Sequence, residues 1–169
     1  MNFSEERKFE LMRLSIEQAK RTKLAELATQ FDSSKIIPLV GGVLVSANGE
    51  VLTSAYRGET SHDRHCEQDL LEKAKGVQKA DTSLFVTLEP CIYRREVVPC
   101  SKLIVESGIK KVFIGMLDPN VLINGMGKAY MEENGVVVHN YFEQFEKEIM
   151  AMNAGFIKKL QARDAEDTK

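Results

Sequence analysis

Three short pieces of the chain hold its most reactive side chains: His-Cys-Glu at residues 65–67, Thr-Leu-Glu-Pro-Cys at residues 87–91 and Pro-Cys at residues 99–100. One histidine and two cysteines are good zinc ligands, and three protein ligands leave one coordination position open for water. A glutamate two residues after the histidine is close enough to exchange protons with that water. The fold is therefore expected to bring these three pieces together.

The composition is that of one ordinary globular domain. The 169 residues are 43% hydrophobic and 28% charged, with a net charge of -2, which fits a single domain. No apolar run approaches the ~18 residues of a membrane span. The charged first eight residues do not resemble a signal peptide, so the cytoplasm is the expected location. There three cysteines favour metal or catalytic roles over disulfides.

The hydrophobic pattern predicts strands alternating with helices over one domain, residues 1–160. A helix at 4–30, with a break near 21–23, precedes two strands joined by an Asn-Gly turn. The pattern predicts an α/β fold, a mixed five-stranded sheet with helices on both faces. The strands are expected at 36–45, 51–56, 84–88, 111–116 and 136–139 and the later helices at 66–75, 99–107, 125–133 and 142–160. Residues 161–169 are polar enough to form a disordered tail.

This arrangement places the reactive pieces where such folds bind ligands. Ligands lie at the carboxyl ends of the strands, where the helices begin. His65 precedes a predicted helix, and Cys91 follows the strand at 84–88. Cys91 and Cys100 both lie near predicted helix starts, whose free N–H groups favour the thiolate that zinc needs.

The spacing of these motifs resembles a known family. His-x-Glu followed by Pro-Cys is the pattern of the zinc deaminases, although here eight residues separate the cysteines instead of two. With that spacing the chain resembles the pyrimidine deaminase domain of the bacterial riboflavin-pathway enzyme (diaminohydroxyphosphoribosylaminopyrimidine deaminase), of the cytidine-deaminase-like superfamily. The resemblance extends from about residues 38–41 through 118–120 and 125–127 to 155–156, which is most of the chain.

The resemblance implies a three-layer α/β/α cytidine-deaminase-like fold and a hydrolase that removes an exocyclic amine. It implies that zinc is held by His65, Cys91 and Cys100, with Glu67 as the catalytic proton carrier. It also implies a homodimer or homotetramer. The substrate would be a small molecule, an aminopyrimidine, nucleoside or nucleotide. An acidic chain with no Trp argues against nucleic acid as the substrate.

Residues near the expected substrate depart from the family pattern. Ile37 stands where the family has Asn, and Tyr93 and Glu96 stand where it has a His and a basic residue that contact the substrate. A carboxylate at 96 should repel a phosphorylated ligand unless Arg94 or Arg95 takes over. We therefore expect the chemistry to be retained on a changed substrate. The candidate substrate-binding residues are Ile37, Tyr56, His62, Glu89, Tyr93, Arg94, Arg95 and Glu96.

Other roles remain open for several of these residues. Cys66 is either a small buried side chain or the fourth ligand of a structural zinc, and His62 is a solvated loop residue, such a ligand or a substrate contact. Glu89 either caps backbone amides or touches the substrate. Asp118 is more typical of a turn than of a ligand site. The alternative functions are a deaminase of another nucleoside, nucleotide or free base, and a zinc-stabilised binding module without activity. A carboxylate at position 67 favours catalysis.

Overall fold

A mixed sheet runs through the computed structural model, which describes residues 3–22, 36–94 and 97–167. The strand order is β2-β1-β3-β4-β5. Strand β1 is antiparallel to both of its neighbours, and β3, β4 and β5 are parallel. The strands are β1 (Gly41–Val45), β2 (Val51–Tyr56), β3 (Ser83–Leu88), β4 (Lys111–Met116) and β5 (Val137–Asn140). The predicted mixed five-stranded sheet is confirmed.

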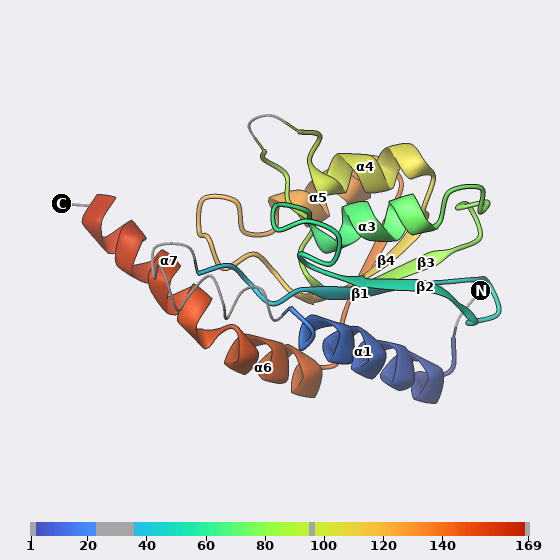
Figure 1. Cartoon of the computed structure of the whole chain (residues 1–169), viewed down its shortest axis with the longest axis horizontal. Helices are drawn as coiled ribbons and strands as arrows, with labels where there is room; N and C mark the ends of the chain where they lie inside the picture. Colours follow the sequence, from blue (N-terminus) through green and yellow to red (C-terminus); the bar gives the residue numbers. More distant parts are fainter. Residues whose placement is uncertain (1–2, 23–35, 95–96, 168–169) are drawn as a thin grey trace.

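Helices cover both faces of the sheet (Figure 1). Helices α1 (Glu5–Ala19) and α6 (Glu143–Met152) lie on one face. The other face carries α3 (Cys66–Lys73), α4 (Cys100–Ser107) and α5 (Met126–Glu133). Helix α7 (Ala154–Asp167) follows α6 and projects past the end of the sheet. This three-layer α/β/α arrangement confirms the predicted fold class. Within the described ranges, no helix combines the length and the apolar composition that crossing a bilayer requires.

The core forms where the central strands meet helix α1. Every residue of β3 is buried, as expected for a strand covered on both faces. Phe85 on β3 is the register partner of Phe113 on β4, and their rings stack with centroids 4.2 Å apart. A Cβ atom on Gly41 would lie 2.2 Å from the backbone nitrogen of Ala19. Glycine at position 41 therefore allows α1 to pack directly on β1.

The N-terminal segments differ from the expectation. Helix α1 begins after Ser4, whose hydroxyl accepts the N–H of Arg7 at 3.1 Å, and it ends at Ala19. The predicted helix over 4–30 is therefore shorter in its described part, and residues 23–30 lie outside the described residues. The strand predicted to begin at residue 36 begins at Gly41. The backbone N–H of Leu39 donates instead to the side chain of Asn153, so it is not available to a strand ladder.

The predicted helix over 142–160 is divided at Asn153. This side chain is buried; its oxygen accepts from Leu39 N at 2.8 Å, and its amide donates to the carbonyls of Leu39 and Ile149. A polar side chain that bonds the backbone in this way competes with continued helix geometry. Helix α7 then continues to Asp167, so residues 161–167, predicted to belong to a disordered tail, are helical.

Candidate metal centre and active site

Three segments bring His65, Cys91 and Cys100 together. His65 is the N-cap of α3, Cys91 follows β3, and Cys100 begins α4. The Nδ1 atom of His65 lies 3.6 Å from Sγ of Cys91 and 3.5 Å from Sγ of Cys100. Tetrahedral zinc with Zn–N of about 2.0–2.1 Å and Zn–S of about 2.3 Å would place nitrogen and sulfur about 3.6 Å apart. The donor set and its spacing therefore fit zinc.

The N-terminus of α4 faces Cys91. The backbone N–H of Cys100 donates to Sγ of Cys91 at 3.3 Å, and the N–H and hydroxyl of Ser101 both donate to the Cys91 carbonyl. A hydrogen bond from the Cys100 thiol lowers the pKa of Cys91 to about 4, and the same interaction raises the pKa of Cys100. These donors therefore favour the thiolate form of Cys91, which is the form that binds a cation.

The described part of the chain places no fourth ligand beside this set. His65, Cys91 and Cys100 form the one cluster of three or more such side chains found among the described residues. Sγ of Cys66 is buried and donates to the carbonyl of Ala55 at 3.2 Å. The half-exposed His62 ring pairs with Asp63. These placements favour a site with an open coordination position over a four-ligand structural site.

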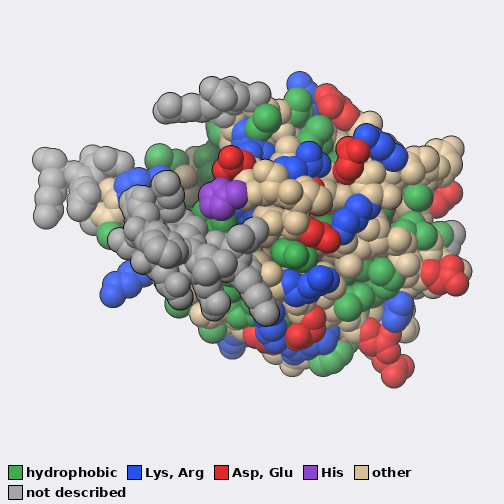
Figure 2. Space-filling view, viewed as in Figure 1, with side chains coloured by type: hydrophobic (Ala, Val, Ile, Leu, Met, Phe, Trp, Pro, Cys, Tyr) green, Lys and Arg blue, Asp and Glu red, His purple; other side chains and the backbone are tan. Residues whose placement is uncertain are grey.

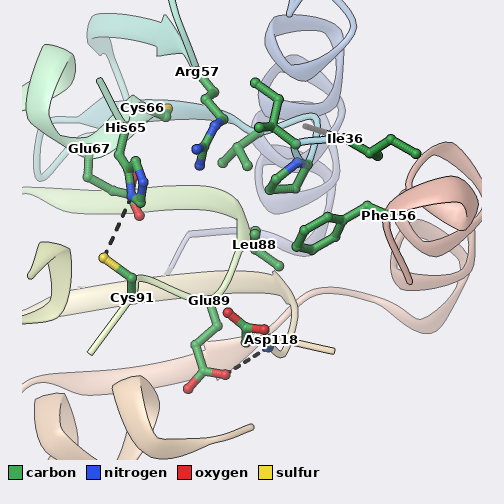
Figure 3. Close-up of a pocket in the computed structure, with 13 residues that line it drawn as sticks. Ile36, Arg57, His65, Cys66, Glu67, Leu88, Glu89, Cys91, Asp118 and Phe156 are labelled. Atoms are coloured by element: carbon green, nitrogen blue, oxygen red, sulfur yellow. Dashed lines mark hydrogen bonds between the residues drawn. The ribbon is translucent and has the colours of Figure 1, made fainter. Parts of the chain in front are cut away.

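A cavity of about 250 Å³ opens beside two of these three residues, His65 and Cys91 (Figure 3). His65, Glu67 and Cys91 line one side of it. Across from them the wall is apolar and comes from the segment before β1, the end of β3 and helix α7. The apolar residues are Ile36, Ile37, Pro38, Val40, Leu88 and Phe156. Such a cavity suits a small flat ring held next to polar groups.

Glu67 lies in the first turn of α3 and reaches this cavity. It is 4% exposed, and burial is the largest influence on it, raising the pKa of its carboxyl group, while the nearby His65 opposes that rise. A carboxyl group with a raised pKa can both accept and return a proton closer to neutral pH.

Glu89 lines the cavity but gives its oxygens to the backbone. Oε2 accepts the N–H groups of Asp118 and Gly125 at 2.9 Å each, and Oε1 accepts the N–H of Lys128 at 2.8 Å. A Cβ on Gly127 would lie 2.1 Å from the carbonyl oxygen of Pro90. These contacts hold the start of α5 against the turn that carries Cys91, which favours the capping role for Glu89.

Arg94 also has a defined partner. Its Nη1 donates to Oε1 of Gln68 at 2.9 Å, and its Nη2 donates to the carbonyl of Asp63 at 3.0 Å. The same Oε1 of Gln68 accepts the backbone N–H of His65. Arg94 therefore ties the segment after Cys91 to the start of α3 and does not line the cavity.

The remaining predicted substrate residues are distributed as follows. Ile37 lines the cavity. Tyr56 lies under the guanidinium of Arg21, at 4.8 Å from the ring centroid, and Tyr93 is 72% exposed. Neither Tyr56, Tyr93 nor His62 is among the described residues that line the cavity. Arg95 and Glu96 lie outside the described residues.

Arg57, Asp118 and Phe156 are among the residues that line the cavity and were not predicted as site residues. Burial lowers the pKa of Arg57 and raises that of Asp118. Arg57 could have been identified, since it follows a strand directly at the edge of the sheet where ligands bind. Phe156 follows the helical spacing of the last helix, so only the three-dimensional packing reveals its place in the cavity.

Comparisons with known proteins agree with this geometry. A family model described as the cytidine and deoxycytidylate deaminase zinc-binding region matches residues 7–116. The riboflavin biosynthesis protein RibD of Actinobacillus pleuropneumoniae is 40% identical over 108 residues, which cover 60% of this chain and 26% of that protein. The chain thus spans about a quarter of the length of this relative.

Two further likenesses cover more of the chain. A diaminohydroxyphosphoribosylamino-pyrimidine deaminase of Buchnera aphidicola subsp. Schizaphis graminum is 32% identical over 142 residues, which cover 84% of this chain and 90% of that protein. The solved structure of Acinetobacter baumannii RibD, form 1, superposes with a TM-score of 0.77 at 28% identity, covering 92% of this chain and 40% of the other. The chain belongs to the family of cytidine and deoxycytidylate deaminases, with RibD-type deaminases among its relatives.

Proposed function

We propose that the chain is a zinc-dependent hydrolytic deaminase that removes an exocyclic amine from an aminopyrimidine-type ring. The observation that carries this proposal is a buried carboxyl, Glu67, on the same cavity as a His-Cys-Cys set that has an open side. One water is consumed and one ammonia is released for each ring, whose C–NH2 becomes C=O.

The chain's own residues divide the work of this reaction. His65, Cys91 and Cys100 would hold the zinc, which when bound supplies a Lewis acid that makes water a nucleophile at neutral pH. Glu67 accepts one proton of the attacking water and passes it to a ring nitrogen, then takes the remaining hydroxyl proton as C=O forms and gives it to the leaving amine. The apolar wall excludes bulk water from the ring. Glu89 and Arg94 position the ligand-bearing segments through the hydrogen bonds described above.

The substrate is proposed to differ from the phosphorylated pyrimidine named for the Buchnera relative. Tyr93 and Glu96 replace a histidine and a basic residue of the family pattern. Arg94 is not free to substitute for that basic residue, since its terminal nitrogens bind Gln68 and Asp63.

In Figure 2, Lys and Arg side chains are interspersed with Asp and Glu over the visible face, whereas a nucleic-acid surface is concentrated in basic residues. These features favour a small-molecule substrate.

A zinc-stabilised binding module is the alternative from another class. Burying a carboxyl group destabilises a fold unless hydrogen bonds or an ion pair compensate, and a binding module gives no functional reason to keep Glu67 buried beside His65 and Cys91. The position of Glu67 therefore favours the enzyme.

Ammonia release tests the proposal directly. The zinc-loaded protein would be incubated with aminopyrimidine bases, their nucleosides and their phosphates, including the riboflavin-pathway pyrimidine phosphate. We expect release from at least one ring compound. Release from none of them would contradict the deaminase proposal. Efficient ammonia release from the riboflavin-pathway phosphate would support the deaminase proposal but contradict the proposal that the substrate has changed.

We also propose a homodimer or homotetramer, as the resemblance implies. Light scattering on a sizing column would give the mass of the assembly. A monomer at working concentrations would exclude this part of the proposal.

A further inference from the structure

Arg57 brings a cation into the cavity of the candidate active site. It follows β2 directly, and its backbone N–H donates to the carbonyl of Val40 at 2.8 Å, which anchors the residue at the edge of the sheet. Its side chain lines the same cavity as His65 and Glu67, and Figure 3 shows the guanidinium directed into that cavity. Among the described residues that line the cavity, Arg57 is the single Lys or Arg.

The guanidinium of Arg57 is incompletely satisfied. Its Nε atom is buried, and no atom of the described chain forms a hydrogen bond with it. Other arginines are different: Arg13 donates to Glu148, Arg64 to Asp69, and Arg94 to Gln68. A buried donor without a partner destabilises the folded protein. Unsatisfied buried groups are few in native structures, and a ligand in the adjacent cavity would supply the acceptor.

We propose that Arg57 is a specificity-determining residue that donates a hydrogen bond to an oxo group on the amine-bearing ring. This inference rests on the proposed deaminase function and names what the ring must carry. A neutral oxo group fits better than an anionic group, because Glu67, Glu89 and Asp118 line the same cavity and would repel a second negative charge. The apolar wall holds the ring, and Arg57 selects its orientation.

Calorimetry with matched rings tests this assignment without turnover. In zinc-loaded protein carrying Glu67→Gln, the Kd would be measured for cytosine against 4-aminopyrimidine and for isocytosine against 2-aminopyrimidine. Each pair differs by one oxo group and the ring N–H that accompanies it. In at least one pair we expect the oxo compound to bind about tenfold or more tightly, as for a hydrogen bond to a charged donor.

Two further variants in the same background locate the effect. Arg57→Met should remove the preference for the oxo compound, and Arg57→Lys should keep part of it. Arg13→Met is the matched control, since Arg13 pairs with Glu148 outside the cavity, and it should keep the full preference. The proposal is overturned by no preference in either pair, by no binding of any compound, or by a preference that survives Arg57→Met.

Thermal unfolding separates this role from a structural one. Because Nε of Arg57 is buried without a partner among the described residues, Arg57→Met should hold or raise the melting temperature, and a loss of several degrees would contradict the proposal. The binding assay also stands apart from the ammonia assay. Ammonia release without a preference for the oxo compounds would contradict only the proposed role of Arg57. A preference for the oxo compounds without ammonia release would contradict only the proposed deaminase activity.

Discussion

At the scale of single residues, polar side chains near the cavity fall into two groups. Some already form hydrogen bonds within the protein, and others are directed into the cavity. Glu89 gives both oxygens to backbone N–H groups, and Arg94 gives its terminal nitrogens to Gln68 and Asp63. Glu67 and Arg57 are directed into the cavity instead. Residues of the first kind support the site, and residues of the second kind remain available to a ligand.

The capping role of Glu89 predicts a stability effect. Glu89→Gln replaces one acceptor oxygen by an NH2 group that faces backbone donors, so we expect a loss of about 1–3 kcal/mol in the free energy of unfolding. Denaturant unfolding measures it. The matched control is Glu132→Gln on the exposed face of α5, which should stay within about 0.5 kcal/mol of the parent. Equal effects of the two substitutions would contradict the capping role.

The buried phenol of Tyr141 should make the stability of the fold depend on pH in the alkaline range. Burial raises the pKa of its phenol, whose hydroxyl bonds Ser15 at 2.7 Å. The neutral phenol therefore stabilises the fold below the unfolded pKa of about 10, and this stabilisation is lost as the pH rises above that value. Tyr141→Phe should be about 1 kcal/mol less stable at pH 8.

The same comparison at higher pH provides the check. The stability gap between parent and Tyr141→Phe should shrink between pH 8 and pH 11, because the variant lacks the ionisable group. Denaturant unfolding at both values would measure the gap. A gap that is constant with pH would show that this phenol does not govern the alkaline behaviour.

At the scale of elements, close backbone contacts determine how the layers meet. A Cβ on Gly41 would lie 2.3 Å from the carbonyl oxygen of Ser15, in addition to its contact with Ala19. Gly41→Ala should therefore destabilise the fold by about 1–3 kcal/mol or more through overpacking. Thermal unfolding measures this effect.

Gly155→Ala serves as the control for this prediction. A Cβ on Gly155 meets nothing within 4 Å, and alanine favours a helix over glycine by up to about 1 kcal/mol. The control should be neutral or slightly more stable. If Gly41→Ala were as stable as the parent, the direct packing of α1 on β1 would be contradicted.

Elements defined by local signals could be predicted, and those defined by distant partners could not. The Asn-Gly turn was predictable because Gly49 adopts a φ of +85°, which favours glycine. The break at Asn153 was not, because its partner Leu39 lies 114 residues away in the chain. Strand β1 begins at Gly41 and not at residue 36 for the same reason, since the backbone N–H of Leu39 donates to the distant Asn153.

At the scale of the whole molecule, the site joins segments that are distant in the sequence. The clustering of His65, Cys91 and Cys100 could be predicted because their residue types and spacing are typical of zinc ligands. The apolar wall of the cavity could not, because Phe156 reaches it from α7. Its place depends on how the layers pack, which no local motif encodes.

Metal removal is predicted to destabilise the molecule, because the ligands join α3, the segment after β3 and α4. Free zinc at a hundredfold excess over its Kd adds about 2.7 kcal/mol to the folded state, roughly 5–10 °C in Tm for a chain of this length. Thermal unfolding with zinc and with a chelator measures the shift. Cys100→Ser should abolish it, and His62→Ala should keep it. Loss of the shift in His62→Ala would make His62 a fourth ligand.

The most direct test of the account compares the parent with Glu67→Gln. Zinc content by elemental analysis and ammonia release would be measured together, across the same panel of bases, nucleosides and phosphates. We expect about one zinc per chain in both proteins and a loss of ammonia release of about a hundredfold or more in the variant. A variant that binds zinc and releases ammonia as fast as the parent would contradict the role of Glu67 and, with it, the proposed mechanism.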